Sequence, residues 1–177
     1  MPVEDIIARV DAIYHDLQFT EVRRWLDAEP GRKAIGYLPT YVPREIIHAA
    51  GMLPVGILGG AGQLEIIRGD AYFQSYICQM PRSTIELALT GRLDFLSGFL
   101  FPSICDVIRN LSGIWKILYP EKYSRYFDPP QNYDPAVGGH YYSDELRTLV
   151  RDMGQIAGRT ITDADLRASI AAYNDNR

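Results

Sequence analysis

The alternation of short apolar segments with helical ones constrains the fold most. The pattern of residues 33–38 predicts a short buried strand, residues 43–50 a helix with a proline near its first turn, and residues 53–58 a second strand that runs into a glycine-rich stretch. A strand, a helix and a strand within about 25 residues indicate two parallel strands joined by a crossover helix. The first half of the chain therefore favours an α/β fold.

The same alternation continues along the chain. Residues 83–89 have helical spacing and are followed by Gly91, the apolar run 95–101 suits a central parallel strand, and residues 105–118 are helical again. Aromatic residues and prolines crowd residues 119–142, where Asp128-Pro-Pro-Gln indicates the exit from a strand into a surface loop. We expect a doubly wound α/β fold with a mostly parallel, Rossmann- or flavodoxin-like sheet.

Helical segments precede and follow this sheet. Apolar spacing predicts an amphipathic helix over residues 3–28, bent near residues 18–20, and two trailing helices at residues 143–157 and from Thr162 onward, where Thr162-Asp-Ala-Asp165 resembles a capping box. We divide the chain into a helical segment 1–30, an α/β lobe 31–142 and helices 143–177. The last helix has no closing cap or return strand in the sequence, so we expect it to lead into a missing second lobe of a longer protein; the alternative is a short protein that ends in a frayed helix.

Charge and hydropathy exclude some function classes. The net charge is −4 with a pI near 5.3, and the basic residues are scattered, so a nucleic-acid partner is not expected. The N-terminus is acidic where a secretory signal would be basic, and no apolar run approaches the roughly 20 residues of a membrane span. We expect a cytoplasmic protein without a membrane partner.

The two cysteines, Cys78 and Cys105, are the main candidates for function. Each lies at the expected start of a helix, where unpaired N–H groups and the positive end of the peptide dipole favour a thiolate. One strand-and-helix unit separates them, so a parallel sheet would bring both loops to its carboxyl edge. In a reducing compartment such cysteines are more often ligands, reactive groups or inert core residues than a disulfide, and the residues alone leave these readings open.

Three motifs carry a family resemblance. The stretches are Tyr41-Val-Pro-Arg-Glu-Ile-Ile-His-Ala-Ala-Gly-Met-Leu-Pro54, Ser75-Tyr-Ile-Cys78 and Phe101-Pro-Ser-Ile-Cys105-Asp-Val-Ile-Arg109. With them the chain resembles the benzoyl-CoA reductase and 2-hydroxyacyl-CoA dehydratase subunits, and within that family the N-terminal portion of the gamma (C) subunits of ATP-dependent benzoyl-CoA reductases. The resemblance covers residues 6–177 and implies the first lobe of a two-lobe subunit.

The resemblance also implies a cofactor and a reaction. Family members hold a [4Fe-4S] cluster with three cysteines, and Cys78 and Cys105 match the two in the first lobe, so the third ligand is expected outside this segment. The implied activity is reduction of benzoyl-CoA, an aryl-CoA thioester, to a cyclohexadiene carbonyl-CoA in a hetero-oligomer, with electrons from ferredoxin and ATP hydrolysis in partner subunits. The alternatives are a 2-hydroxyacyl-CoA dehydratase subunit, which eliminates water by radical chemistry, and a cluster-free lobe that docks partners with both cysteines buried.

Weaker candidates lie around these motifs. Tyr41, Glu45 and His48 in the Tyr-x-Pro-x-Glu stretch could donate protons, although helix capping and a hydrogen-bonded, partly buried histidine are the preferred interpretation. Next to the cysteines stand polar residues expected to cap the helices and orient the loops: Arg82, Ser83, Ser103 and Asp106. Histidine metal ligation is not expected at His15 or His140.

Two further features have more than one interpretation. Gly59-Gly-Ala-Gly62 lacks the lysine and hydroxyl residue of a phosphate-binding Walker loop, so we do not expect ATP binding; a tight turn is predicted, and a loop that contacts CoA is the alternative. An aromatic belt could stack on a benzoyl ring or pack against another lobe or subunit. Its members are Tyr119, Tyr123, Tyr126, Phe127, Tyr133, Tyr141 and Tyr142.

Overall fold

Four parallel strands form the centre of the computed structural model, which describes residues 2–175. They are β1 (Ala34–Tyr37), β2 (Leu53–Gly56), β3 (Leu96–Pro102) and β4 (Tyr123–Phe127), in the order β2-β1-β3-β4. In this register Gly36 lies opposite both Val55 and Phe99, and Leu100 lies opposite Arg125. The expected doubly wound α/β fold is confirmed.

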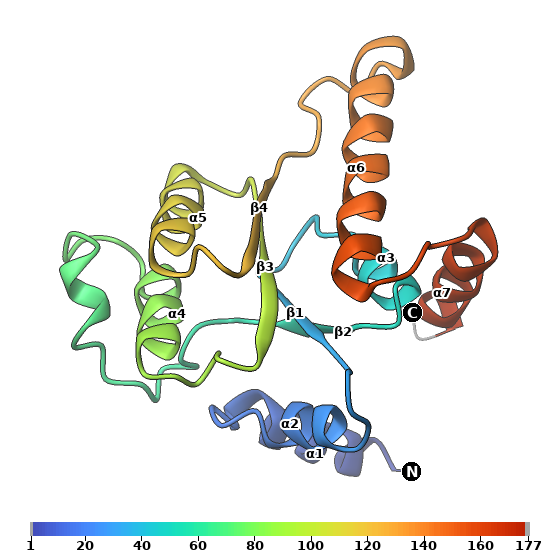
Figure 1. The fold of residues 1–177 in the computed structure, drawn as a ribbon. Coiled ribbons are helices and arrows are strands. Elements are labelled where there is room, and N and C mark those ends of the chain that lie inside the picture. Colours follow the sequence, from blue (N-terminus) through green and yellow to red (C-terminus); the bar gives the residue numbers. More distant parts are fainter. Residues whose placement is uncertain (1, 176–177) are drawn as a thin grey trace.

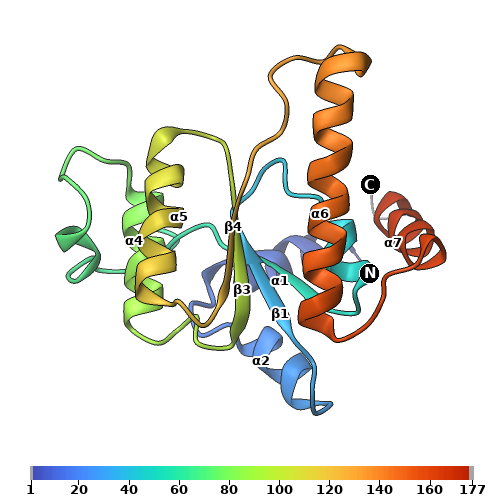
Figure 2. The ribbon, with the colours of Figure 1, turned by 45° about the horizontal axis from the view of Figure 1, so that its top comes forward.

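Helices cover both faces of the sheet (Figure 1). On one face lie α4 (Gln79–Leu89) and α5 (Asp106–Leu118), and on the other lie α3 (Arg44–Ala49), α6 (His140–Ala157) and α7 (Asp163–Asp175), as the rotated view also shows (Figure 2). From β1 the chain moves outward to β2, whereas from β3 it moves in the opposite direction to β4. The strand order therefore reverses between β1 and β3, which is where open α/β sheets form a crevice at their carboxyl edge.

The alternating side chains of the strands build one core on each face of the sheet. Leu96, Phe99 and Phe101 of β3 pack beneath α4 and α5, where Phe99 and Phe101 stack at 4.5 Å between ring centroids and Trp115 covers both. Leu100, between them in sequence, faces the second core beneath α3 and α6. The apolar run in β3 is buried on both sides because helices cover both faces.

Helix α6 belongs to this second core. Its Leu149 and Met153 are fully buried against the sheet, although the sequence-based division placed residues 143–177 outside the α/β lobe. Gly158 ends the helix with a φ of 71°, as its sequence predicts. A π-helical turn, Pro135–Gly139, precedes α6.

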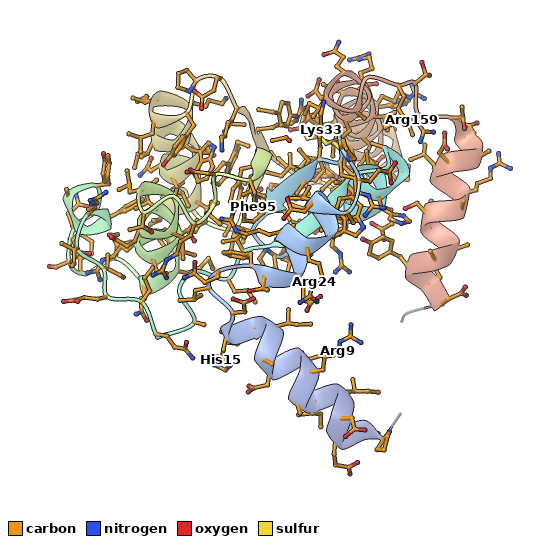
Figure 3. All side chains as sticks on the ribbon, turned by 60° about the horizontal axis from the view of Figure 1, so that its bottom comes forward. Arg9, His15, Arg24, Lys33, Phe95 and Arg159 are labelled. Carbon is orange, nitrogen blue, oxygen red and sulfur yellow. The ribbon has the colours of Figure 1, made fainter. Side chains whose placement is uncertain are left out.

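The leading helix is broken rather than bent. Helix α1 (Val3–His15) and helix α2 (Thr20–Asp27) are separated by a turn in which Phe19 has a φ of 54° and the Asp16 carboxylate accepts hydrogen bonds from the backbone of Gln18 and Thr20 at 2.9 and 2.7 Å. Phe19 and neighbouring apolar residues pack on the core, whereas α1 has no buried residue and lies at the outside of the molecule (Figure 3). Val10, Ile13 and Tyr14 of α1 line a pocket with residues of β2.

Other boundaries differ little from expectation. Helix α4 begins one turn earlier than residue 83, at Gln79, because a proline in the first turn, Pro81, removes only an N–H that has no partner within the helix. The capping box at α7 is confirmed, with Thr162 N to Asp165 Oδ2 at 2.8 Å and Asp165 N to Thr162 Oγ1 at 3.2 Å. None of the helices within residues 2–175 has the length and apolar character to cross a membrane.

Candidate functional site

Both cysteines lie at the carboxyl edge of the sheet. Cys78 is the N-cap residue of α4 and Cys105 that of α5, and these helices start at that edge because they connect parallel strands. The two helices contact each other on the same face of the sheet (Figure 1). Both thiols are free and exposed, and neither caps its helix with a side-chain hydrogen bond, so both sulfur atoms are available to a ligand or metal. The alternative in which both cysteines are buried as inert packing does not agree with their exposure in residues 2–175.

The loop that carries Cys105 is short and is held by backbone hydrogen bonds. Ser103 N donates to Phe127 O at 2.9 Å, which ties the loop to the end of β4, and Ile104 N donates to Pro102 O at 2.8 Å. The carbonyl of Cys105 accepts from the backbone of Ile108 at 3.2 Å. The backbone around this sulfur is therefore fixed by the end of the sheet and the start of α5.

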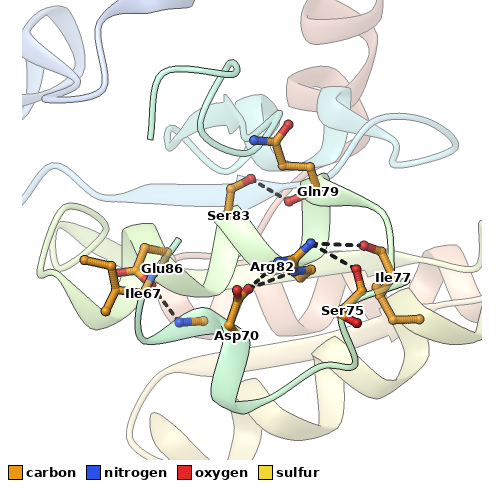
Figure 4. Close-up of polar contacts among 9 residues, drawn as sticks. Ile67, Asp70, Ser75, Ile77, Gln79, Arg82, Ser83 and Glu86 are labelled. Carbon is orange, nitrogen blue, oxygen red and sulfur yellow. Dashed lines mark hydrogen bonds and ion pairs between the residues drawn. The ribbon is translucent and has the colours of Figure 1, made fainter. Parts of the chain in front are cut away.

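The loop that carries Cys78 is long, and three polar residues of α4 hold it (Figure 4). Arg82 forms an ion pair with Asp70 at 2.6 Å, and Ser83 accepts a hydrogen bond from Gly60 N at 3.0 Å. Glu86, only 3% exposed, accepts from Gly69 N at 2.6 Å and from the backbone of Ile67 at 3.1 Å. The orienting role expected for Arg82 and Ser83 agrees with these contacts, and Glu86 adds to it.

An arginine follows each cysteine by four positions. Arg82 follows Cys78 and Arg109 follows Cys105, so each guanidinium stands one helical turn after a sulfur-bearing residue. Arg109 lies over the Tyr126 ring at 5.4 Å from its centroid, and the hydrogen bond to that phenol raises the pKa of the guanidinium. The spacing is the same at both cysteines, but the guanidinium of Arg82 pairs with Asp70 and that of Arg109 lies over Tyr126.

Exposed apolar side chains surround the same edge. The exposed fraction is 60% for Tyr41, 81% for Tyr76 and 42% for Ile104. Tyr41 lies on the loop after β1, and Tyr76 and Ile104 lie within two residues of a cysteine. Large apolar groups gathered on one surface are typical of a face that binds a ligand or another polypeptide.

The three weaker candidates lie on the loop after β1 and on α3. Tyr41 lies at the carboxyl edge after β1, whereas Glu45 and His48 lie on α3 next to α7. His48 Nδ1 is 2.8 Å from Ser169 Oγ, and the hydroxyl donates to the Glu45 carbonyl at 2.8 Å. The hydrogen-bonded histidine considered above agrees with this arrangement, whereas Tyr41 and Glu45 line one pocket at the end of β1.

The aromatic belt and the remaining histidines do not form one surface. Tyr123 and Phe127 face α6, where Tyr123 Oη donates to Asp152 at 2.7 Å, whereas Tyr126 faces α5. Tyr133 is 87% exposed. The His15 ring hydrogen-bonds with the carbonyl of Asp11, on the same helix.

The donor set fits a cluster only in part. Two exposed thiols at one edge are the ligand type that iron–sulfur clusters require. Among residues 2–175, no group of three histidine, cysteine or acidic side chains could hold a metal ion. A cluster at this edge would therefore take two ligands from this segment and the others from outside it.

Comparison with known proteins bears on the identity of this site. Residues 39–177 match the sequence profile of the family described as 2-hydroxyglutaryl-CoA dehydratase, D-component. The chain belongs to this dehydratase family. It is 63% identical over 177 residues to the C subunit of benzoyl-CoA reductase from Thauera aromatica, an alignment that covers 100% of this chain and 46% of that protein.

Two dehydratase subunits are more distant relatives in the family. The beta subunit of (R)-2-hydroxyglutaryl-CoA dehydratase from Acidaminococcus fermentans is 35% identical over 148 residues, covering 83% of this chain and 39% of that protein. The beta subunit of lactoyl-CoA dehydratase from Anaerotignum propionicum is 33% identical over 176 residues, which covers 97% of this chain and 46% of that protein. The chain thus spans less than half the length of these members of the dehydratase family.

Sequence reasoning missed two residues of this region. Glu86 is the one carboxylate in the apolar helical stretch 83–89, and a charged residue among buried positions could have indicated a buried hydrogen-bond acceptor. The spacing of Arg109 from Cys105, which repeats that of Arg82 from Cys78, was also readable in the sequence. Its contact with Tyr126 was not, because it depends on how α5 packs beside β4.

Proposed function

We propose that this segment supplies two cysteine ligands, Cys78 and Cys105, to the [4Fe-4S] cluster of an enzyme that reduces benzoyl-CoA. The observation that carries the proposal is the position of two free, exposed thiols at the starts of two adjacent helices on one sheet edge. The 63% identity to a benzoyl-CoA reductase subunit supports the choice of substrate. The third cysteine ligand comes from outside this segment.

The proposed reaction adds two electrons and two protons to the aromatic ring and gives a cyclohexadiene carbonyl-CoA. When bound, the cluster supplies single electrons, which reach it from ferredoxin at the expense of ATP hydrolysed in partner subunits. The chain's own contribution is to fix the two cysteine-bearing loops, through Arg82, Ser83 and Glu86 on one side and the β3–α5 turn on the other.

The residues near the cysteines would tune and enclose the site. Arg82 and Arg109 each follow a cysteine by one helical turn, and Arg82 holds the Cys78 loop through its ion pair with Asp70. The exposed apolar groups at this edge, including Tyr76 and Ile104, would be covered by substrate or by another part of the assembled enzyme. Tyr41, on the same edge, is the candidate in this segment to donate a proton. We place the assembled hetero-oligomer in the cytoplasm, where thiols stay reduced.

The test uses the full-length subunit, assembled with its partners and reconstituted without oxygen. Iron and sulfide content and the cluster absorption should fall to background in Cys78→Ala and in Cys105→Ala. Ser103→Ala, which changes a neighbouring hydroxyl in the Cys105 loop, is the matched control and should keep the cluster. A full cluster content in both cysteine variants would overturn the ligand assignment.

A second function is favoured by the dehydratase relatives. The same two thiolates could serve a 2-hydroxyacyl-CoA dehydratase, in which an electron is used reversibly and water is eliminated without net reduction. Supplying the assembled enzyme with benzoyl-CoA and, separately, with a 2-hydroxyacyl-CoA distinguishes the two, because the products are a dienoyl-CoA and an enoyl-CoA. If this segment only docks partner subunits and binds no cluster, the cysteine variants should contain as much iron as the parent enzyme.

A further inference from the structure

A small polar pocket lies at the carboxyl end of β1, beside the point where the strand order reverses. It has a volume of about 310 Å³, and the residues that line it include Tyr37, Thr40, Tyr41, Arg44 and Glu45. Its lining residues come from the end of β1, the loop that follows and the first turn of α3, and none of them belongs to β3 or to the cysteine-bearing loops. It is thus a cavity separate from the proposed cysteine site, at the same edge of the sheet.

Arg44 is the only basic residue that lines this pocket, and no carboxylate within residues 2–175 pairs with it at 4.0 Å or less. Its guanidinium donates to Tyr37 Oη at 3.5 Å and lies over the Tyr173 ring at 5.1 Å from the centroid. By contrast, Arg82 and Arg125 each pair with carboxylates at 2.6–3.1 Å. Two aromatic residues therefore hold Arg44 in place. Neither carries a charge, so no ion pair within the described part of the chain compensates the guanidinium.

Glu45 brings a carboxylate to the same pocket, but it also lines the neighbouring groove between α3, α6 and α7. Its charge acts on both sides: it is a minor cause of the raised pKa of Arg44, after the hydrogen bond with Tyr37, and after burial it raises the pKa of Tyr142 on α6. Recognition in the pocket then depends on the directed N–H groups of Arg44 and on the hydroxyl groups of Thr40 and Tyr41.

We propose that Arg44 binds a phosphate group of the acyl-CoA substrate in this pocket. The planar guanidinium presents paired N–H donors whose geometry matches a phosphate, and such charge-assisted hydrogen bonds are stronger than neutral ones. The pocket lies at the small end of the range for ligand sites, which suits one end of an extended ligand whose remainder lies along the carboxyl edge. The proposal rests on the proposed function, because that function supplies a phosphate-bearing substrate.

The experiment measures dissociation constants on the assembled enzyme without turnover. The probes are CoA, pantetheine, which lacks the phosphates, and inorganic phosphate. Arg44→Gln should weaken CoA binding about 10-fold to 100-fold and leave pantetheine binding unchanged. Arg44→Lys, which keeps the charge but loses the paired donors, should show a smaller loss. Arg9→Gln, on the exposed helix α1, is the control for removal of one positive charge and should bind CoA normally.

A second variant separates binding from a structural role in holding α7. Tyr173→Leu removes the ring beneath the guanidinium but keeps the cation, so it should bind CoA within a few-fold of the parent. Equal loss in Tyr173→Leu and Arg44→Gln would overturn the proposal, since Arg44 would then act only through α7. Unchanged CoA binding in Arg44→Gln would also overturn it, as would a loss confined to inorganic phosphate. Iron content is measured in the same preparations, so a failure of the cysteine assignment is seen separately.

Discussion

The Ser83 hydroxyl accepts a hydrogen bond from the backbone N–H of Gly60 at 3.0 Å and donates one to the Gln79 carbonyl at 2.8 Å. This joins the glycine-rich turn after β2 to the first turns of α4, which begin at Cys78. The glycine-rich turn and Cys78 are separated by a long loop in the sequence, yet the position of Cys78 depends on how that turn packs against α4.

Substitution of Gly59 should test how closely that turn approaches α4. Gly59 has a φ of 75°, and a Cβ there would lie 2.4 Å from Ser83 Oγ. Gly59→Ala should destabilise the fold by the backbone cost of about 1–2 kcal/mol plus about 1–3 kcal/mol for the steric contact. Gly62→Ala is the matched control, because Gly62 has a φ of 71° and open space around it. Equal losses in the urea-unfolding free energy of both variants would contradict the close approach.

Removal of the Glu86 carboxylate should loosen the loop that leads to Cys78. Glu86→Ala leaves the N–H groups of Ile67 and Gly69 without their acceptor, and a buried unsatisfied donor costs about 1–3 kcal/mol. Glu86→Gln retains one acceptor oxygen and should lose less. Unfolding free energies give the stability, and hydrogen exchange of the Gly69 amide should rise more than that of amides in β3.

The stability of the protein should decrease at alkaline pH through Tyr123. Burial, followed by the hydrogen bond to Asp152, raises the pKa of Tyr123 above its ordinary 10.0. A group whose pKa is raised by folding contributes stability that is complete below the unfolded pKa and is lost as the pH rises beyond it. Stability should therefore fall above pH 10, and Tyr123→Phe should show a shallower fall. The measurement is the melting temperature from pH 8 to 12.

At acidic pH, Asp165 should release helix α7. The hydrogen bonds from Thr162 and then from Arg159 lower the pKa of Asp165 from 3.8 to about 2. A lowered carboxyl pKa contributes stability that is present above 3.8 and lost as the pH falls toward about 2. Asp165→Asn should remove this dependence, whereas Asp163→Asn, which leaves the Thr162 and Arg159 contacts intact, should not. Hydrogen exchange of α7 between pH 2 and 5 gives the readout.

The two thiols should react readily when no cluster is bound. Because Cys78 and Cys105 are free and exposed, an aromatic disulfide reagent should modify 2 thiols per chain, and Cys78→Ser should reduce the count by one. In the reconstituted, assembled enzyme the proposed cluster should protect both. Full reactivity in a preparation that contains iron and sulfide would argue against cysteine ligation by this segment.

Much of the architecture was predictable because it depends on neighbouring residues. The crossover units around β1, β2 and β3, the helix starts at the cysteines and the capping box at Thr162 all follow from local periodicity and capping chemistry. The strand Tyr123–Phe127 was indicated only by its exit at Asp128, because each of its faces carries both an aromatic and a polar side chain, so no apolar alternation marks it. The break at Phe19 was expected only as a bend.

The site was predictable to a lesser degree. The sequence placed Cys78 and Cys105 at one edge, and the motifs around them identified the family; the exposure of both thiols, which excludes inert packing, came from the structure. His48 illustrates the limit, because its partner Ser169 lies 121 positions away and only the packing of α7 on α3 brings the two together.

The sequence by itself determined the order of strands and helices, the two thiols and the family, because side-chain periodicity, caps and motifs act over a few residues. Tertiary structure decided that Glu86 holds the Cys78 loop and that Arg44 stands beside Tyr37 and Tyr173 at a pocket after β1. The physical reason is that these contacts join elements whose relative positions are set by the burial of the two cores on either face of the sheet, and no local pattern encodes that packing.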